Sequence, residues 1–357
     1  MFRNQIINTN PDIDFMKQPI FLGEDLNIQR YDTYKYPFYY NSYQKQIGSF
    51  WRPEEFNLTK DRNDFLNLTD IEQEIFSSNL KFQILLDSVQ NRGIPYLSDF
   101  VSLPEVELSF KTWEFFELIH SYSYTYIIQN VYSNTNEVFD TVLKTGPIMD
   151  RAVSTTKDYN ELLNIHRSDN IATVKDKIFR NLISINILEG LRFYVSFACS
   201  YAFAENKKVE GNAKIIAMIN RDENLHLAIT QKTIDYLRNE PEEGFVDVVK
   251  RNNQLATDMY ASAAEEEIEW AKYLFRNGSI LGLNDSLLID YMKWLTNKRM
   301  KSIGLEPIYS GAKNPFPWIT NWTDSGSIQV ASQETENETY RISSVKNDLD
   351  GLDYTQF

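Results

Sequence analysis

Two stretches of the sequence share one pattern, Glu117-Leu118-Ile119-His120 and Glu223-Asn224-Leu225-His226. A glutamate and a histidine three residues apart on a helix lie about 60° from each other around its axis, one turn along it. Both side chains of each pair can therefore reach the same metal ion. The chain has only three histidines, and these two pairs use two of them. The repeat predicts a helical protein with a metal site.

Two such pairs, with one more carboxylate from each of two further helices, form the ligand set of di-iron and di-manganese helical bundles. Asp87 and Glu189 are the candidates for the remaining carboxylates, because each lies within an apolar run. A charged group on an apolar face costs on the order of several kcal/mol unless it is paired or bound to a metal. A buried ion pair is the alternative, with Arg192 as the partner of Glu189. The third histidine, His166, lies in a polar stretch and is expected at the surface.

The donor types indicate which metals the site takes. Four carboxylates and two imidazoles are hard or borderline ligands that suit iron or manganese. No cysteine lies near these residues in the sequence, which argues against a structural zinc site.

Three tyrosines, Tyr122, Tyr124 and Tyr126, follow His120. At about 100° per residue only Tyr124 lies on the side of the helix that carries Glu117 and His120. A core tyrosine with a satisfied hydroxyl is the alternative to a redox role. Residues on the metal-facing sides of other helices are expected to enclose Tyr124 in a dry pocket, as a phenoxyl radical requires: Phe193, Phe197 and Ile219.

Composition and charge narrow the class of protein. A net charge of -14 argues against nucleic acid as a partner, whereas 42% hydrophobic residues with 14% aromatics support a large core. The single cysteine, Cys199, lies in an apolar run and is expected to be a buried thiol, which favours a reducing compartment. No signal peptide and no run of about 18 apolar residues is found. We expect a cytoplasmic protein without a membrane segment.

The pattern predicts an all-α chain in three parts. Residues 1–55 form an irregular N-terminal arm, because four prolines interrupt it. Residues 56–322 form the helical domain. Residues 323–357 have little apolar content and form a flexible tail whose last residues regain apolar side chains.

Local signals bound the helices of the domain. Capping boxes at Thr69 and Ser102 begin two of them, the first ending at Gly93 and Pro95 and the second carrying Glu117 and His120. A break at Gly146-Pro147 precedes a polar connection. Four further helices are expected at about 172–206, 210–240, 244–276 and 284–302.

Several longer motifs resemble the small, radical-generating subunit of class I ribonucleotide reductase, from about Ile28 to the C-terminus. The motifs are Trp51-Arg52-Pro53-Glu54-Glu55, Glu117-x-x-His120-Ser121-x-Ser123-Tyr124, Glu189-x-x-Arg192-Phe193-Tyr194 and Arg221-Asp222-Glu223-x-x-His226. The resemblance implies a ferritin-like helical bundle elaborated with extra helices, with a di-metal carboxylate site in its core. It also implies two iron ions per chain, with a manganese pair or a mixed manganese–iron pair as alternatives.

The resemblance assigns roles to individual residues. One metal is held by Asp87, Glu117 and His120, and the other by Glu189, Glu223 and His226. Tyr124 matches the radical tyrosine. Trp51 and Asp222 match a hydrogen-bonded electron path that includes His120, and the tail residue Tyr340 matches the tyrosine that relays the radical to the large subunit.

The implied activity is that of a ribonucleoside-diphosphate reductase, an oxidoreductase that works only with its large subunit. The di-metal centre activates dioxygen and generates a radical stored on Tyr124, which the large subunit uses to reduce ribonucleotides to deoxyribonucleotides. The tail docks on the large subunit, and the small subunit is a homodimer. One alternative is a di-metal oxidase of the same fold, which would not need Trp51, Tyr340 or a docking tail. The other is ferritin-like iron storage, which predicts a compact bundle of about half this length without a radical tyrosine.

Overall fold

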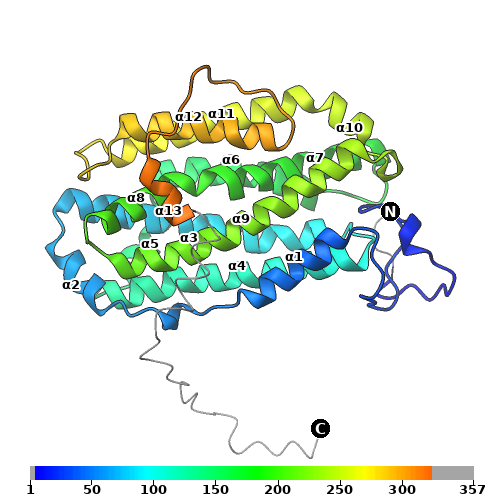
Figure 1. The fold of residues 1–357 in the computed structure, drawn as a ribbon, viewed down its shortest axis with the longest axis horizontal. Helices are drawn as coiled ribbons and strands as arrows, with labels where there is room; N and C mark the ends of the chain where they lie inside the picture. Colours follow the sequence, from blue (N-terminus) through cyan, green and yellow to red (C-terminus); the bar gives the residue numbers. More distant parts are fainter. Residues whose placement is uncertain (1–4, 324–357) are drawn as a thin grey trace, which may run out of the picture.

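The computed structural model describes residues 5–323, and the regular structure within this range is helical (Figure 1). The only extended pairing there consists of two isolated bridges, Phe21 with Val101 and Ile280 with Leu283. The α-helices of this range are α1 (Pro37–Gly48), α2 (Thr59–Asn67), α3 (Asp70–Ser98), α4 (Pro104–Val131), α5 (Asn136–Val142), α6 (Gly146–Leu163), α7 (Ile171–Ile187), α8 (Tyr194–Glu205), α9 (Glu210–Asn239), α10 (Val246–Arg251), α11 (Asn253–Leu274), α12 (Asp285–Ser302) and α13 (Thr320–Thr323). The all-α prediction is confirmed for this range.

Four long helical runs form the centre of the bundle and extend along its long axis (Figure 1). α3 packs on α4 and α8, and α9 packs on α4, α7 and α8. Each run contributes to the predicted ligand set, which is Asp87 on α3, Glu117 and His120 on α4, Glu189 between α7 and α8, and Glu223 and His226 on α9. The fold therefore brings residues far apart in sequence to one place inside the core.

Further helices cover this centre. α6 packs on α3 and α7, while α11 and α12 pack on each other and contact the segment between α7 and α8. The N-terminal arm was expected to be irregular, but it contains α1, which packs on α4 and α9. Pro37 is the first residue of α1, where the missing N–H is not needed for helical hydrogen bonding.

Prolines account for two further differences from the prediction. α3 does not stop at Gly93 and Pro95 but continues to Ser98. Instead of a polar connection after Gly146-Pro147, the structure has α6, with Pro147 in its first turn. Pro147 lies in the first turn of α6, where its missing N–H is not needed, whereas Pro95 lies inside α3 and the helix continues for three residues beyond it.

Of the two predicted capping boxes, only the first forms. Thr69 and Glu72 exchange hydrogen bonds between side chains and backbone N–H groups at the start of α3. At α4 the Ser102 hydroxyl instead accepts from the N–H of Gly23 at 2.6 Å. The Glu105 carboxylate accepts from the N–H of Tyr36 at 3.1 Å. Both side chains tie the N-terminal arm to the bundle, and α4 begins without a side-chain cap.

The expected helix at 172–206 is one apolar run with an irregularity in its middle. α7 and α8 are joined through a π-turn, Leu188–Arg192. By length and composition Ile171–Glu205 could cross a membrane, but its most apolar window is wholly buried in the bundle. It is therefore a core helix, and Cys199 within it is buried as predicted. The expected helix at 244–276 is divided at Asn252 into α10 and α11.

The predicted tail, residues 323–357, lies outside the described residues except for Thr323. Tyr340 is also outside them.

Candidate metal centre

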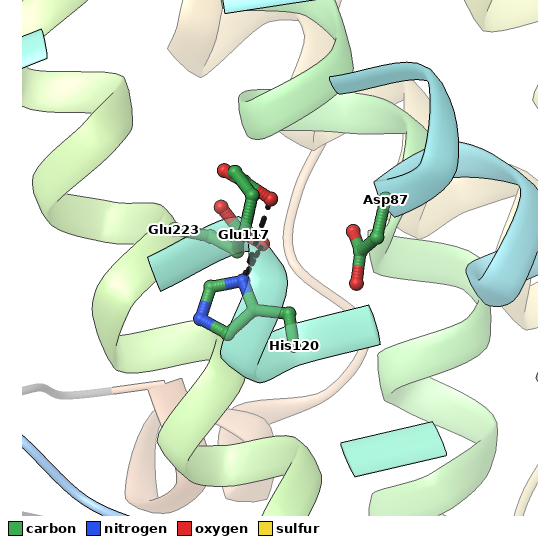
Figure 2. A group of neighbouring side chains, drawn as sticks. All are labelled: Asp87, Glu117, His120 and Glu223. Atoms are coloured by element: carbon green, nitrogen blue, oxygen red, sulfur yellow. Dashed lines mark ion pairs between the residues drawn. The ribbon is translucent and has the colours of Figure 1, made fainter. Parts of the chain in front are cut away.

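The first predicted ligand group converges between α3, α4 and α9. Asp87, Glu117, His120 and Glu223 are each 0% exposed and offer donor atoms within 4.8 Å of one another. Figure 2 shows Asp87 extending from its own helix toward the other three side chains. His120 Nδ1 lies 3.0 Å from Glu223 Oε1 and 3.5 Å from Glu117 Oε2. The Nδ1 atom is therefore the histidine nitrogen that faces the carboxylates.

The second group is built from α4, the π-turn and α9. Its members, Glu117, Glu189, Glu223 and His226, also offer donor atoms within 4.8 Å of one another, and all are buried. His226 Nδ1 lies 3.1 Å from Glu117 Oε1 and 3.0 Å from Glu223 Oε2. Glu117 and Glu223 belong to both groups, so their carboxylates lie where they could bridge two metal ions.

Burial and mutual repulsion make this cluster unfavourable without a cation. Burial raises the pKa of Asp87 well above its usual range, and the negative charges of Glu117 and Glu223 raise it further. Burial likewise raises the pKa of Glu189, and the charge of Glu223 adds to this effect. Burial alone would lower the pKa of His120, but the charge of Glu223 and the hydrogen bond to Asp222 outweigh it, so the pKa is raised.

The donor atoms of the cluster fit a metal pair. Both carboxylate oxygens of Asp87 and Oε2 of Glu189 are buried and have no hydrogen-bond partner among the residues that the structure describes. Buried polar atoms are rarely left unpaired in proteins. Two divalent cations would balance the four carboxylates of the two groups. Oxygen and imidazole donors without thiolate suit iron or manganese.

His120 is connected to the predicted electron path on its other side. Its Nε2 atom lies 3.3 Å from Asp222 Oδ2, and the indole Nε1 of Trp51 donates to the same oxygen at 2.7 Å. Arg221 donates to the other oxygen of Asp222 at 2.8 Å. The structure thus brings Trp51, Asp222 and His120 into one hydrogen-bonded chain. Asp222 also orients the ring of His120 so that Nδ1 faces the carboxylates.

The three tyrosines after His120 differ in burial as predicted. Tyr124 is 0% exposed, and burial together with the charge of Asp87 raises its pKa well above the usual range. Tyr122 is 45% exposed and donates to Glu54 Oε1, whereas Tyr126 donates to the carbonyl of Phe56. The residues expected to enclose Tyr124 belong to the same buried core, namely Phe193, Phe197 and Ile219.

Sequence and structure comparisons agree with this geometry. The family model for the small chain of ribonucleotide reductase matches residues 29–315. The chain belongs to this family. The ribonucleoside-diphosphate reductase subunit beta of Buchnera aphidicola subsp. Acyrthosiphon pisum is 43% identical to it over 362 residues, covering 96% of each chain. Subunit beta of ribonucleoside-diphosphate reductase 1 from Escherichia coli O157:H7 is 40% identical, again covering 96% of each chain.

A solved ribonucleotide reductase structure has the same fold. The R2 subunit from Clostridium botulinum superimposes with a TM-score of 0.80 at 29% sequence identity, covering 90% of this chain and 99% of that one. The predicted fold class, an elaborated ferritin-like bundle with its carboxylate and histidine cluster in the core, is confirmed. Small chains of ribonucleotide reductase generate a tyrosyl radical at a dinuclear metal centre for the large subunit, which confirms the general function predicted for this chain.

The structure differs from the alternative considered for Glu189, which was a buried ion pair with Arg192. Arg192 instead pairs with Glu266 on α11, with 2.8 Å between its Nη1 atom and Oε2 of Glu266. Glu189 Oε1 instead accepts a hydrogen bond from Gln90, whose own carbonyl accepts from Tyr159 on α6. An arginine three residues after a glutamate does suggest a helical pair, but the π-turn changes the angle between the two side chains.

Sequence reasoning missed three residues beside the ligands of this small chain. Trp113 donates from Nε1 to Glu117 Oε1 at 2.7 Å. Gln90 and Tyr159 form the chain of hydrogen bonds that ends on Glu189. The spacing of four residues from Trp113 to Glu117 was available as a signal, since such residues lie on one helix face. Tyr159 lies on another helix and gave no signal.

Proposed function

We propose that this small chain stores its radical on Tyr124 and holds its metal pair with the six predicted ligands. The ligands are Asp87, Glu117, His120, Glu189, Glu223 and His226. The observation that carries the proposal is that both Glu-x-x-His pairs, with Asp87 and Glu189, converge in a buried cluster of four carboxylates and two imidazoles, in which several oxygen atoms have no hydrogen-bond partner among the described residues. The negative charge of Asp87 acts on Tyr124, which supports a position of the tyrosine beside this cluster.

The proposed cofactor is two iron ions per chain, and a manganese pair or a mixed manganese–iron pair suits the same donors. When bound, the metal pair would supply Lewis acidity and two of the four electrons that reduce dioxygen, the other two coming from Tyr124 and from an external donor. The protein contributes buried, oriented ligands. Asp222 fixes His120 in the orientation that presents Nδ1, and Trp113 and Gln90 each hold one carboxylate ligand by a hydrogen bond.

Burial of Tyr124 suits radical storage. The side chain is 0% exposed, so water and soluble reductants do not reach its ring. Its raised pKa means that the phenol is neutral before oxidation and must lose a proton when it loses an electron. The more exposed Tyr122, with its hydroxyl on Glu54, lacks this protection.

Trp51, Asp222 and His120 are proposed to carry electrons between the metal site and the exterior. The hydrogen bond from Trp51 to Asp222 and the contact of Asp222 with His120 support this path. Residues 323–357, including Tyr340, are proposed to dock on the large subunit and relay the radical. We further propose that the chain works in the cytoplasm.

A homodimer is proposed for the small chain. An exposed apolar surface formed by α4 and the segment that follows α1 supports it, because exposed apolar patches mark protein interfaces. Phe50 and Phe115 stack with ring centroids 6.2 Å apart, and both are about half exposed at 53% and 48%. Leu118, one turn further along α4, is 53% exposed. Light scattering combined with size-exclusion chromatography tests this, and a monomer at micromolar concentration would contradict it.

Electron paramagnetic resonance tests the radical assignment. Metal-free protein is loaded anaerobically with iron(II) and exposed to oxygen, and we expect a tyrosyl signal. Tyr124→Phe should bind two metal ions per chain and lose this signal, whereas the matched variant Tyr122→Phe should retain it. A normal signal in both variants would refute the assignment to Tyr124. Binding of two irons without any radical in the wild type would instead favour manganese or a di-metal oxidase.

A further inference from the structure

The π-turn that carries Glu189 is held from outside by an arginine. Arg299 on α12 is buried, and its Nε atom donates to the carbonyl of Gly190 at 3.0 Å. A Cβ atom on Gly190 would lie 3.3 Å from Cδ of Arg299 and 3.0 Å from Leu227. The absent side chain thus allows α12 and α9 to close on this turn.

The guanidinium of Arg299 is satisfied by neutral groups rather than by a carboxylate. Its Nη2 atom donates to the Tyr194 hydroxyl at 2.7 Å, and the guanidinium lies over the Tyr194 ring, 5.0 Å from the ring centroid. A buried charge is costly unless it is hydrogen-bonded. The position of Arg299 is therefore coupled to the position of the Gly190 carbonyl, and through it to the adjacent residue Glu189.

Hydrogen bonds continue from Tyr194 to residues 317–323, the segment that leads into the C-terminal tail and is called its root. The Tyr194 hydroxyl donates to Oδ1 of Asn224 at 3.1 Å. Asn224 directly follows the ligand Glu223, and its Nδ2 atom donates to the carbonyl of Thr323 at 3.3 Å. Thr323 ends α13, which packs on α9 (Figure 1). This series of hydrogen bonds thus connects the π-turn to Thr323, the last residue that the structure describes.

A second contact anchors this root. Trp322 stacks on Tyr201 of α8 with ring centroids 5.1 Å apart and donates to Glu205 at 2.9 Å. Trp322 and Thr323 therefore pack against α8, which follows the π-turn, and against α9, which carries Glu223 and His226.

We propose that Arg299 is a positioning residue that holds the π-turn so that Glu189 faces the metals, and that Tyr194 and Asn224 couple this turn to the root of the tail at residues 317–323. Metal binding at Glu189 and packing of the root then stabilise each other, since coupling between two sites is reciprocal. This inference rests on the proposed function, because it takes Glu189 to be one of the proposed metal ligands.

Metal titration tests the positioning role. Metal-free wild type, Arg299→Met and Arg299→Lys are titrated with manganese(II), and free ion is measured by electron paramagnetic resonance. We expect the weaker of two sites to lose about tenfold in affinity in Arg299→Met, as when other groups supporting metal ligands are removed. Lysine retains the charge but has a single donor nitrogen in place of the separate Nε and Nη2 atoms that contact Gly190 and Tyr194, so Arg299→Lys should not restore full affinity. Lys298→Met on the same helix is the matched control and should bind like the wild type.

Hydrogen exchange separates positioning from general destabilisation. In metal-free Arg299→Met, amides of residues 188–194 should exchange faster while the remaining core keeps its wild-type rates. Wild-type affinity at both sites, or faster exchange spread evenly through the bundle, would overturn the positioning role. Failure of the wild type to bind two ions would refute the proposed metal function instead, and the exchange comparison of metal-free proteins would still decide whether Arg299 holds the turn.

Tyr194→Phe tests the coupling to the tail root. This variant keeps the ring but removes the hydroxyl that joins Arg299 to Asn224. Manganese(II) should slow hydrogen exchange in residues 317–323 of the wild type and leave it unchanged in Tyr194→Phe, although the variant still binds the metal. Equal slowing in both proteins, or none in the wild type, would overturn the coupling.

Discussion

The indole Nε1 of Trp113 donates a 2.7 Å hydrogen bond to Oε1 of Glu117, one turn further along α4. The same indole stacks on His226 of α9, with ring centroids 5.0 Å apart and an interplanar angle of 24°. One side chain therefore contacts a residue of each Glu-x-x-His pair. Because Glu117 belongs to both metal groups, Trp113 can restrict the orientation of a carboxylate that serves two ions.

Replacing Trp113 with phenylalanine should weaken metal binding more than it weakens the fold. Phenylalanine retains an apolar ring but cannot donate to Glu117, and the loss of such a supporting hydrogen bond typically costs about 10–100-fold in metal affinity. Trp270→Phe is the matched control, since this indole is also buried and its N–H has no partner within the described part of the chain. Manganese(II) titration should show weaker binding in Trp113→Phe only. Equal affinities of the two variants would contradict a role for the hydrogen bond.

Gly93→Ala should destabilise the protein through Tyr159. A Cβ atom at position 93 would lie 2.1 Å from the ring of Tyr159, so the ring must move. Overpacking of this kind costs about 1–3 kcal/mol. Gly146→Ala is the control, because a Cβ atom at position 146 has no neighbour within 4 Å. Urea unfolding of both variants measures the difference, and equal free energies of unfolding would contradict the close packing of Gly93 on Tyr159.

The convergence of four of the six proposed ligands could be predicted from the sequence because helical geometry relates residues three positions apart, whereas Asp87 and Glu189 were indicated by the apolar runs around them. Glu117 and His120 needed no knowledge of the tertiary structure, and the same is true of Glu223 and His226. The burial of Tyr124 and the exposure of Tyr122 followed from the same periodicity.

The remaining features depend on contacts between segments distant in sequence. Arg192 pairs with Glu266 rather than with Glu189 because α11 packs beside the π-turn, and no local signal gives that packing. Ser102 was expected to cap α4 but accepts a hydrogen bond from Gly23 of the N-terminal arm. Pro147 was expected to interrupt the helical structure, yet it lies in the first turn of α6. Local patterns predict which groups need partners, whereas the choice of partner is a tertiary property.

Cys199 should be unreactive in the folded protein. It is 0% exposed, and burial raises the pKa of its thiol to about 12. Only the thiolate attacks disulfide reagents, so little reactive species exists at pH 8. Titration with an aromatic disulfide should detect no thiol in the native protein and one per chain in guanidinium chloride. Rapid labelling of the native protein would show that the core opens around α8.

The pH dependence of stability should differ between the metal-free and the metal-loaded protein. In the folded chain the pKa values of Asp87 and Glu189 are raised by burial, and those of His120 and His226 are raised by carboxylates that outweigh their burial. Groups with raised pKa values stabilise the fold while they are protonated, and this contribution is lost as pH rises. The metal-free protein should therefore lose stability as pH rises above about 4, the ordinary pKa of the two carboxyls, and more steeply above about 6.5, the ordinary pKa of histidine.

Manganese(II) should reverse this trend, because metal binding requires deprotonated ligands and is favoured by higher pH. Calorimetry at pH 6, 7 and 8 should give a falling melting temperature without metal and a stabilisation by metal that grows with pH. Glu223 contributes no slope in this window, since its pKa is lowered by His120 and its hydrogen-bond partners despite burial, and it stays ionised. Asp87→Asn removes one titrating carboxyl and should flatten the metal-free profile. A melting temperature that rises with pH in the metal-free wild type would contradict the raised pKa values on which this prediction depends.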